Sequence, residues 1–462
     1  MKKNRLQKFL LSLCAMGILF TSCEKEEVNE SLNVDAVEME EAPFTNYMVI
    51  TEGNELSKSM ESFLKMNGSE IVNTIPEIGI AIVSTTDKNF IENTLKNKEV
   101  ASVIPDYEIA WIPSDVGVEA PGIGNNEFFY NQQYLWGMEA IDAESAWDLG
   151  FTGQGASVFV LDSGIDPNHR DLAPNVNREL SVSFIQNENW FLFPSTTFNH
   201  GTHVAGTIAA AQTNYGIIGV APNAELVAVK VLSELSGNGP FSAINAGMVY
   251  AGNNGADVIN MSLGATLNKN GTLIDANGVP YRIPAKYIME LVNAQQRAAD
   301  YASRMGSTII ASAGNDGINY DGHSSYIKLP AGLNNVISIS ATAPEGYDYL
   351  AAYTNFDIPA SYTTHGRSLV DFAAPGGDSD VAVTDMILSA GNNNSFYWSA
   401  GTSMAAPHVA GVAALIIGKN GGQMDPLEVE KKLTNTSDKV DGNGNHVYFG
   451  QGRVNAYRAV TE

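Results

Sequence analysis

The chain contains almost no cysteine. Only two of its 462 residues are cysteine, Cys14 and Cys23, and both lie within the first 23 residues. Any folded region beyond them can therefore contain neither a disulfide nor a metal site built from thiolates. Its stability must come from the size of the hydrophobic core, from bound ions, or from both.

Basic residues are also scarce. The chain has 26 Lys and Arg against 51 Asp and Glu, so its formal net charge is -25. Binding to nucleic acid requires a basic surface, and anionic lipid headgroups would be repelled, so we expect neither as a partner. Hydrophobic residues make up 44% and charged residues 17%, which is typical of a packed globular protein and argues against disorder or a coiled coil.

Long hydrophobic runs are missing as well. The apolar run at residues 9–20 follows a basic start, and at about 12 residues it is too short to span a bilayer. With the FTSC sequence that ends at Cys23 it resembles a bacterial lipoprotein signal. That resemblance implies a signal peptide over 1–22 and lipidation of Cys23; the alternative is an ordinary signal peptide with a chance cysteine. No later stretch could cross a membrane, so we expect membrane contact only through lipidated Cys23 of an exported protein.

The next segments differ in composition. Residues 23–44 are rich in Asp and Glu and lack aromatic residues until Phe44, which is typical of a flexible acidic tether. Residues 45–112 predict a small α+β domain with a βαββαβ order. Three of its four strands are expected at 47–51, 79–84 and 100–104, and its helices are expected at 56–66 and 89–98. Residues 113–126 are rich in Gly, Pro and Asn and predict a linker.

The remaining residues, 127–462, alternate short apolar runs with helical segments. Continuously apolar runs fit strands that are buried on both faces of a sheet. We therefore predict an α/β domain with a mainly parallel sheet flanked by helices. The expected strands are 157–161, 225–232, 258–261, 308–311 and 336–340.

Three segments carry residue types suited to nucleophilic catalysis. VFVLDSGID at 158–166 ends a buried strand in Asp162, NHGTHVAGTIAA at 199–210 begins a helix with His200 and His203, and GTSMAAPHVAGVAAL at 401–415 opens a helix with Ser403. Taken singly, each has a simpler interpretation. Asp162 fits a turn, His200 fits a helix cap or a packing residue, and the third segment fits a plain buried helix.

Taken together, the order Asp, His, Ser with these flanks resembles the subtilisin-like serine proteases, the subtilases. The resemblance runs from about Gln132 to Ala456. It implies a subtilisin-like fold and a serine endopeptidase that forms an acyl-enzyme on Ser403. It assigns the general base to His200 rather than His203, and the orienting acid to Asp162. It implies no cofactor for catalysis.

The same resemblance extends to the oxyanion hole and the substrate cleft. Asn315, in ASAGND, matches the side-chain donor to the oxyanion, with the Ser403 backbone N–H as the second donor; the simpler interpretation of Asn315 is a turn residue. Two segments match those that pair with an extended peptide substrate, and a third matches one wall of the primary specificity pocket. The substrate-binding residues implied are Gly237, Gly239, Ser262, Leu263 and Gly264, with Ser312, Ala313 and Gly314 in the wall.

Two regions depart from the compact family members. Residues 265–285 predict an inserted loop that leaves the second substrate segment directly and shapes specificity. Residues 316–329 also differ in length. Within them, Lys328 has two interpretations: a lysine at the base of the specificity pocket, favouring an acidic residue before the scissile bond, or a solvated loop lysine.

The resemblance also implies a structural calcium ion. Oxygen donors of this kind suit calcium, although position 213 is Thr where the family often has Asn. The ligands implied are the side chains of Gln132, Asp171 and Thr213 and the carbonyls of Ala211, Tyr215 and Ile217.

Residues 45–112 resemble the inhibitory propeptide of subtilases. The resemblance implies that the tail at 105–113 occupies the substrate cleft until the chain is cut between Ala110 and about Asn126. Such a cut separates the catalytic domain from Cys23, so the mature enzyme is either released or held through the bound propeptide. Two rival functions also fit the sequence: a catalytically silent binding lipoprotein on the same fold, and an esterase with the same triad.

Overall fold

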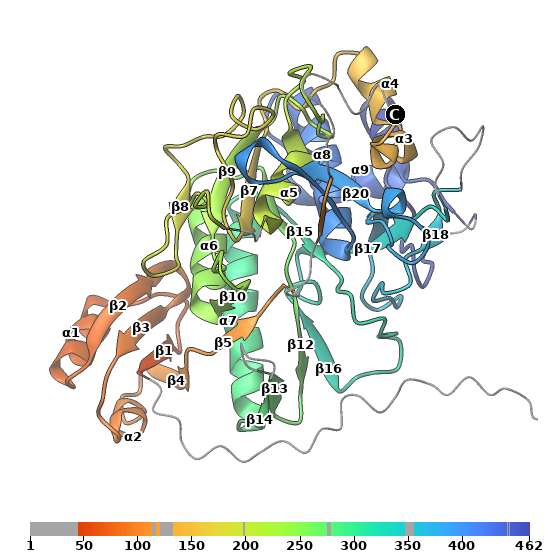
Figure 1. The fold of residues 1–462 in the computed structure, drawn as a ribbon. Helices are drawn as coiled ribbons and strands as arrows, with labels where there is room; N and C mark the ends of the chain where they lie inside the picture. Colours follow the sequence, from red (N-terminus) through yellow and green to blue (C-terminus); the bar gives the residue numbers. More distant parts are fainter. Residues whose placement is uncertain are drawn as a thin grey trace, which may run out of the picture. The chain divides into compact units, whose positions relative to one another are not determined.

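The structure is a computed structural model (Figure 1), and it describes residues 45–112, 117–120, 133–196, 199–274, 279–346, 355–440, 442 and 444–462. All of them belong to one compact unit, residues 36–462. The predicted signal peptide, the tether with Cys23, and Gln132 lie outside the described residues, as does most of the predicted linker. Among the described helices, none combines the length and apolarity needed to cross a membrane.

The first described elements form a four-stranded antiparallel sheet with strand order β2-β3-β1-β4. Helix α1 begins after Ser57, whose hydroxyl accepts a hydrogen bond from the Met60 N–H and so caps the helix. Strand β2 is largely exposed, and its sequence EIVNTI mixes three apolar residues with three polar ones, so it lacks a long apolar run. The bounds are β1 (Asn46–Thr51), α1 (Lys58–Met66), β2 (Glu70–Ile75), η1 (Pro76–Ile78), β3 (Ile80–Ser84), α2 (Phe90–Thr94) and β4 (Val100–Pro105).

The second sheet has eight strands and is mainly parallel, which confirms the predicted fold class. Its order is β18-β17-β15-β11-β7-β9-β8, with β19 also paired to β17, and the one antiparallel pair among these is β17 with β18. All five expected strands are present. The bounds are β7 (Ser157–Asp162), β8 (Val182–Ser183), β9 (Glu225–Lys230), β11 (Val258–Met261), β15 (Thr308–Ser312), β17 (Val336–Ala343), β18 (Ile358–Pro359) and β19 (Phe372–Pro375).

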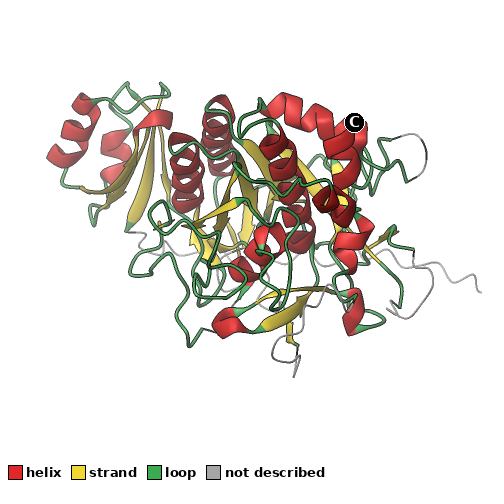
Figure 2. Ribbon diagram, turned by 90° about the horizontal axis from the view of Figure 1, so that it is seen from above, coloured by secondary structure: helices red, strands yellow, loops and turns green. Residues whose placement is uncertain are grey.

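Strand β7 shows why this sheet is apolar throughout. Successive side chains of a strand point to opposite faces. Val158 and Val160 join the hydrophobic cluster that contains helices α5 (His200–Ala209) and α8 (Thr402–Lys419). Phe159 and Leu161 join the cluster on the other face. That second cluster includes residues of α6 (Phe241–Asn253) and α7 (Ala285–Arg304). Figure 2 shows helices on both sides of the central strands.

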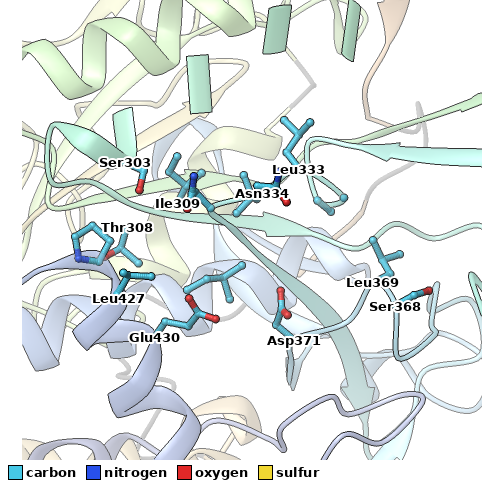
Figure 3. A pocket seen from close by; sticks show the side chains of 16 residues that line it. Ser303, Thr308, Ile309, Leu333, Asn334, Ser368, Leu369, Asp371, Leu427 and Glu430 are labelled. Atoms are coloured by element: carbon cyan, nitrogen blue, oxygen red, sulfur yellow. The ribbon is translucent and has the colours of Figure 1, made fainter. Parts of the chain in front are cut away.

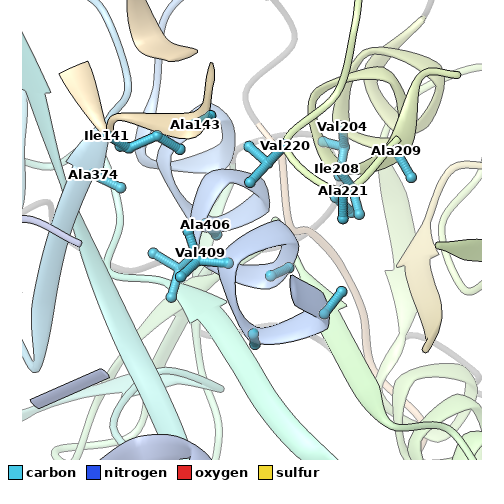
Figure 4. Packing of buried hydrophobic residues seen from close by; sticks show 14 of the residues in the cluster. Ile141, Ala143, Val204, Ile208, Ala209, Val220, Ala221, Ala374, Ala406 and Val409 are labelled. Carbon is cyan, nitrogen blue, oxygen red and sulfur yellow. The ribbon is translucent and has the colours of Figure 1, made fainter. Parts of the chain in front are cut away.

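Helix α8 packs closely because one of its faces is made of small residues. A Cβ on Gly411 would lie 2.4 Å from the Val220 Cβ, so a larger residue there would push the helix away. Figure 4 shows Ala406 and Val409 of this helix within the cluster that also holds Val220. Four shorter helices complete the fold: α3 (Trp136–Ala140), α4 (Ala143–Asp148), α9 (Pro426–Thr436) and α10 (Ala456–Thr461).

Small sheets surround the central one. The described part of 265–285 is not the loop that we predicted, because β12 pairs with β13 and β16, and β13 pairs with β14. Residues 118–119 of the predicted linker also form a strand, which pairs with β21. The bounds are β5 (Glu108–Ala110), β6 (Val118–Glu119), β10 (Asn238–Pro240), β12 (Ala265–Asn268), β13 (Thr272–Ile274), β14 (Pro280–Arg282), β16 (Tyr326–Leu329), η3 (Val383–Asp385), β20 (Ile387–Ala390), η4 (Asn392–Asn394) and β21 (Phe396–Ser399).

Candidate active site

Asp162 and His200 form a buried pair at the carboxyl end of β7. The His200 Nδ1 lies 3.0 Å and 2.9 Å from the two carboxylate oxygens of Asp162, and the two residues are 2% and 1% exposed. Gly201 permits this contact, since a Cβ there would lie 2.2 Å from the Gly164 carbonyl oxygen. A carboxylate on Nδ1 fixes the imidazole tautomer that leaves Nε2 to act as a base.

His203, one turn further along α5, has a different environment. Its Nε2 lies 3.1 Å from the carbonyl oxygen of Ile387 and 3.0 Å from that of Tyr397. Burial lowers the pKa of His203 to about 3, so the imidazole is neutral at physiological pH. Its role is to join α5 to β20 and β21, and it has no carboxylate partner comparable to that of His200.

Ser403 lies in the first turn of α8, where the helix dipole favours negative charge. Its hydroxyl donates to the carbonyl oxygen of Ser262 at 3.1 Å, and the Ser262 hydroxyl donates to the Ser403 carbonyl oxygen at 2.7 Å. These reciprocal bonds fasten the start of α8 to the segment that follows β11. Ser403 is 8% exposed, so its environment is largely shielded from water.

Asn315 is oriented by Thr402, a residue for which no role was predicted from the sequence. The Asn315 Oδ1 accepts from the Thr402 N–H at 3.0 Å and from the Thr402 hydroxyl at 2.8 Å. The Thr402 hydroxyl in turn accepts from the Gly314 N–H at 3.0 Å. With Oδ1 occupied, the donor end of the amide lies beside Gly401, where a Cβ would be 3.2 Å from Nδ2. A hydrogen-bond donor therefore sits at the start of α8.

Residues 108–111 of the chain itself contact the two segments predicted to bind substrate, 237–239 and 262–264. Strand β5 pairs antiparallel with β10, with Ile109 opposite Gly239. The next contacts involve Trp111: its indole N–H donates to the Gly239 carbonyl oxygen at 2.9 Å, and its own carbonyl oxygen accepts from the Gly264 N–H at 2.9 Å. The tail thus lies between the two segments in the manner of an added strand.

Upstream of these contacts, Asp106 meets the amino end of α6. Its carboxylate accepts hydrogen bonds from the Ser242 N–H at 3.2 Å and from the Ser242 hydroxyl. Burial raises the pKa of the Asp106 carboxyl to about 6. Carboxylates are favoured at helix amino ends, so this residue fastens the tail to the helix that follows β10.

The predicted pocket wall faces the second substrate segment. Ser312 Oγ donates to the Leu263 carbonyl oxygen at 3.3 Å, and the Ala313 N–H donates to the Ile339 carbonyl oxygen at 2.9 Å. The first bond ties the wall to the segment opposite, and the second ties it to β17. The structure therefore brings 262–264 and 312–314 together as two neighbouring stretches of main chain.

Lys328 is not the solvated loop lysine that was one of our two interpretations. It lies on β16 and is 4% exposed. Its Nζ lies 2.8 Å from Asp316 Oδ2 and donates to Thr266 Oγ1 at 3.1 Å. Burial alone would raise the pKa of Asp316, but Lys328 holds it below its usual value. No role was predicted for Asp316 or Thr266, because nothing in the sequence indicates that β12 and β16 are neighbours.

The residues implied for calcium are brought together in part. Asp171 is buried, and its carboxylate accepts hydrogen bonds from the Thr213 hydroxyl and from the Ile217 N–H, the latter at 3.0 Å. Burial raises the pKa of Asp171. The described residues contain no group of three or more His, Cys, Asp or Glu side chains that could hold a metal ion. A site of the predicted kind relies on carbonyl and hydroxyl oxygens instead, and the Asp171 and Thr213 oxygens fit that chemistry.

A separate cavity of about 300 Å³ lies where β15 and β17 begin (Figure 3). Its lining includes Thr308, Asp371 and Glu430 and none of the catalytic or substrate-binding residues predicted above. Burial raises the pKa of Glu430, and that of Asp371 to about 6. The cavity is thus polar and acidic, and it is distinct from the segments 237–239 and 262–264 that contact residues 108–111.

The comparisons agree with this geometry. Residues 153–452 match the model of the Subtilase family. The thermophilic serine proteinase of Bacillus sp. (strain AK1) is 32% identical over 415 residues, which cover 86% of this chain and 85% of that protein. Thermitase of Thermoactinomyces vulgaris is 35% identical over 338 residues, covering 73% of this chain and 98% of that protein.

A solved structure supports the fold. The epidermin leader peptide processing serine protease of Staphylococcus aureus matches with a TM-score of 0.68 and 22% identity, over 90% of this chain and 97% of that chain. With the family match, these findings show that the chain belongs to the subtilase family. It is a subtilisin-like serine endopeptidase.

Proposed function

We propose that the enzyme hydrolyses peptide bonds through an acyl-enzyme on Ser403, with His200 as general base and Asp162 as the orienting acid. The observation that carries this assignment is the buried Asp162–His200 pair, with both carboxylate oxygens within 3.0 Å of Nδ1. A serine hydroxyl is a weak nucleophile and needs a base to accept its proton. His200 accepts that proton and returns it to the leaving amine, while Asp162 stabilises the imidazolium.

We assign the oxyanion hole to the Asn315 side-chain amide and the Ser403 backbone N–H. The two bonds from Thr402 to Asn315 Oδ1 support this assignment, because they direct the amide's donor end toward the start of α8. A donor held in place before the reaction stabilises the charge that develops on the substrate oxygen without having to reorganise. Thr402 is a positioning residue in this scheme.

We assign residues 45–112 to an inhibitory propeptide whose tail mimics a substrate. The support is the pairing of β5 with β10, the Trp111 bonds to Gly239 and Gly264, and the Asp106 cap on α6. A substrate seated in the same way would occupy the cleft as an added strand between Gly237–Gly239 and Ser262–Gly264. Cleavage of the chain within 110–126 would then release the cleft.

The amino-terminal sequence supports export with Cys23 as a lipid anchor. The linker cut then decides whether the mature enzyme leaves the membrane or stays attached through the propeptide. The contacts of β5, Trp111 and Asp106 do not depend on the peptide bond that is cut. They favour a propeptide that stays bound for some time after cleavage.

A hydroxyl-reactive probe tests this function. A fluorophosphonate should label the enzyme at Ser403, as identified by peptide mapping, and the enzyme should cleave casein. Labelling requires a nucleophile activated by a base, so absence of labelling would favour the silent binding lipoprotein. Labelling together with ester hydrolysis but without casein cleavage would favour the esterase.

We also propose a structural calcium ion held by Asp171, Thr213 and Gln132, with the carbonyls of Ala211, Tyr215 and Ile217. The buried Asp171 carboxylate beside the Thr213 hydroxyl supports it, and a bound cation would compensate the cost of burying that charge. The ion would stabilise the fold without entering the reaction.

Chelation is expected to lower the melting temperature. A ligand present at 100 times its dissociation constant stabilises a fold by about 2.7 kcal/mol, so for a unit of this size excess EDTA should lower the melting temperature by about 3 °C. The measurement uses the Ser403→Ala variant, in which autolysis cannot distort the melt. Asp171→Asn should melt lower at the outset and respond little to EDTA. An unchanged melt of the parent in excess chelator would contradict the site.

A further inference from the structure

The buried lysine of β16 lies against both segments of main chain that form the inner part of the cleft. A Cβ on Gly314 would be 2.3 Å from the Lys328 Nζ, and a Cβ on Gly264 would be 3.3 Å from the Lys328 Cε. The side chain therefore touches the wall 312–314 and the substrate segment 262–264. Its position is fixed by the β12–β16 pairing, in which Lys328 stands opposite Thr266.

This position lies beside the path of a substrate toward the nucleophile. The Gly264 N–H holds the carbonyl oxygen of Trp111, and the carbonyl oxygen of Ser262 accepts from the Ser403 hydroxyl. An extended peptide that passes from the first contact to the second runs along 262–264, and alternate side chains point to opposite sides. The side chain next to the scissile bond then faces the space between 262–264 and 312–314, where the ammonium lies.

The two charged groups in this space, the Lys328 ammonium and the Asp316 carboxylate, differ in their exposure to solvent. The Lys328 ammonium is almost fully buried, whereas the side chain of its partner Asp316 is 40% exposed. An ammonium has three N–H donors. Among the residues that the structure describes, Asp316 and Thr266 take two of them, which leaves one donor for a third partner. The group that is held inside is the cation, and its counter-ion lies toward solvent.

We propose that Lys328 makes the enzyme select glutamate or aspartate as the residue immediately before the scissile bond. This inference rests on the proposed function. A carboxylate would accept the remaining N–H and attract the ammonium. A lysine or arginine would bring two cations together. A large apolar side chain would cover a buried donor and leave it without a partner.

The proposed specificity also predicts where the chain is cleaved to separate the propeptide from the catalytic domain. Between the seated tail, which is described as far as Ile112, and the first residue of β6, Val118, the sequence has a single acidic residue, Asp115. An enzyme that selects acidic residues should therefore mature by cutting after Asp115, which requires the tail to advance along the cleft by two residues from the register in which Trp111 faces Gly264. The mature amino terminus would then be Val116, within the 110–126 range expected for propeptide cleavage.

The test compares peptides of the form succinyl-Ala-Ala-Pro-X-p-nitroanilide, where X is Glu, Gln, Leu or Lys. The mature wild-type enzyme should cleave the Glu peptide with a kcat/KM at least about 10-fold above those of the Leu and Lys peptides. Lys328→Met, which keeps the side-chain length, should lower the Glu-to-Leu ratio by about 10- to 100-fold. Lys269→Met is the matched control, because it removes an exposed lysine in the turn between β12 and β13, whose Nζ donates to the Ser324 carbonyl oxygen; its ratio should equal that of the wild type.

Asp316→Asn distinguishes the two members of the ion pair. If Lys328 sets the preference, removing the competing carboxylate should raise the Glu-to-Leu ratio. If Asp316 sets it, the wild type should prefer Lys and the variant should lose that preference, which would overturn the proposal. A wild type that prefers Leu would also overturn it, even if Lys328→Met fails to fold.

Active-site titration with a fluorophosphonate separates the failures. An enzyme that is labelled at Ser403 and cleaves the Leu or Lys peptide best is a protease without the proposed specificity. A protein that is not labelled and cleaves no peptide contradicts the proposed function itself. Amino-terminal sequencing of the mature enzyme adds a second readout: Val116 supports the proposal, and a cut after a basic or aromatic residue counts against it.

Discussion

Ser403→Ala is expected to lower kcat for peptide substrates by about four orders of magnitude or more and to leave the chain uncut. The variant removes the nucleophile, so only binding and oxyanion stabilisation remain. The fold should survive, because the Ser262 hydroxyl still donates to the main-chain carbonyl of residue 403. The loss should therefore appear in activity and processing and not in the melting temperature.

Mass spectrometry of the purified full-length chain measures the processing. The wild type should yield a catalytic fragment that begins within 110–126, and Ser403→Ala should yield the chain with the propeptide attached. Ser437→Ala is a matched control, since Ser437 is a buried serine whose hydroxyl donates to the Leu433 carbonyl oxygen in another part of the fold. It should be processed like the wild type. Identical cleavage of wild type and Ser403→Ala would show that another protease makes the cut.

The same samples decide between release and anchoring. If the cut propeptide stays in the cleft, both fragments should remain together through gel filtration and should separate in denaturant. The pairing of β5 with β10 and the Asp106 bonds to Ser242 favour this outcome. Elution of the catalytic fragment alone, immediately after the cut, would instead indicate release from the lipidated end.

The parallel sheet could be predicted because its physical signal is local. Strands buried on both faces must be apolar at every position, and all five expected runs became strands. The catalytic residues could be proposed because each lies in a long motif at the end of a strand or the start of a helix. Strand β2 carried a weaker signal, because polar residues occupy half of its positions and leave only a short run of apolar residues.

The ion pair of Lys328 could not be predicted from the sequence in the same way. Its partners Thr266 and Asp316 lie 62 and 12 residues away, and they meet only because β12 and β16 pair across the region that the sequence presented as a loop. A lysine in a polar segment is normally solvated. Only the pairing of β12 with β16 shows that Lys328 is buried against Gly264 and Gly314.

Asn315→Ala is expected to lower kcat by about 10²- to 10³-fold while KM changes by no more than a few fold. The reason is that the amide donor meets little charge on the substrate carbonyl in the ground state and a full negative charge in the tetrahedral intermediate. An interaction that strengthens only on the way to the transition state is lost from kcat and not from binding. Asn315→Asp should lose as much, because it keeps the shape of the side chain and replaces the donor by an acceptor.

Steady-state kinetics on one peptide and inhibition by a peptide boronate measure this effect together. The boronate forms a tetrahedral adduct, so its affinity should fall in parallel with kcat, whereas the affinity of a bound product peptide should stay close to that of the wild type. Asn319→Ala, in the same loop, removes an exposed amide whose oxygen accepts from the nearby Asp321 N–H and should leave both constants unchanged. A rise in KM at unchanged kcat would mean that Asn315 binds the substrate in the ground state rather than its oxyanion.

Thr402→Val tests the orientation of the Asn315 amide, because it removes the hydroxyl that donates to the Asn315 Oδ1. It should lower kcat in the same direction by a smaller factor, while Thr402→Ser restores it.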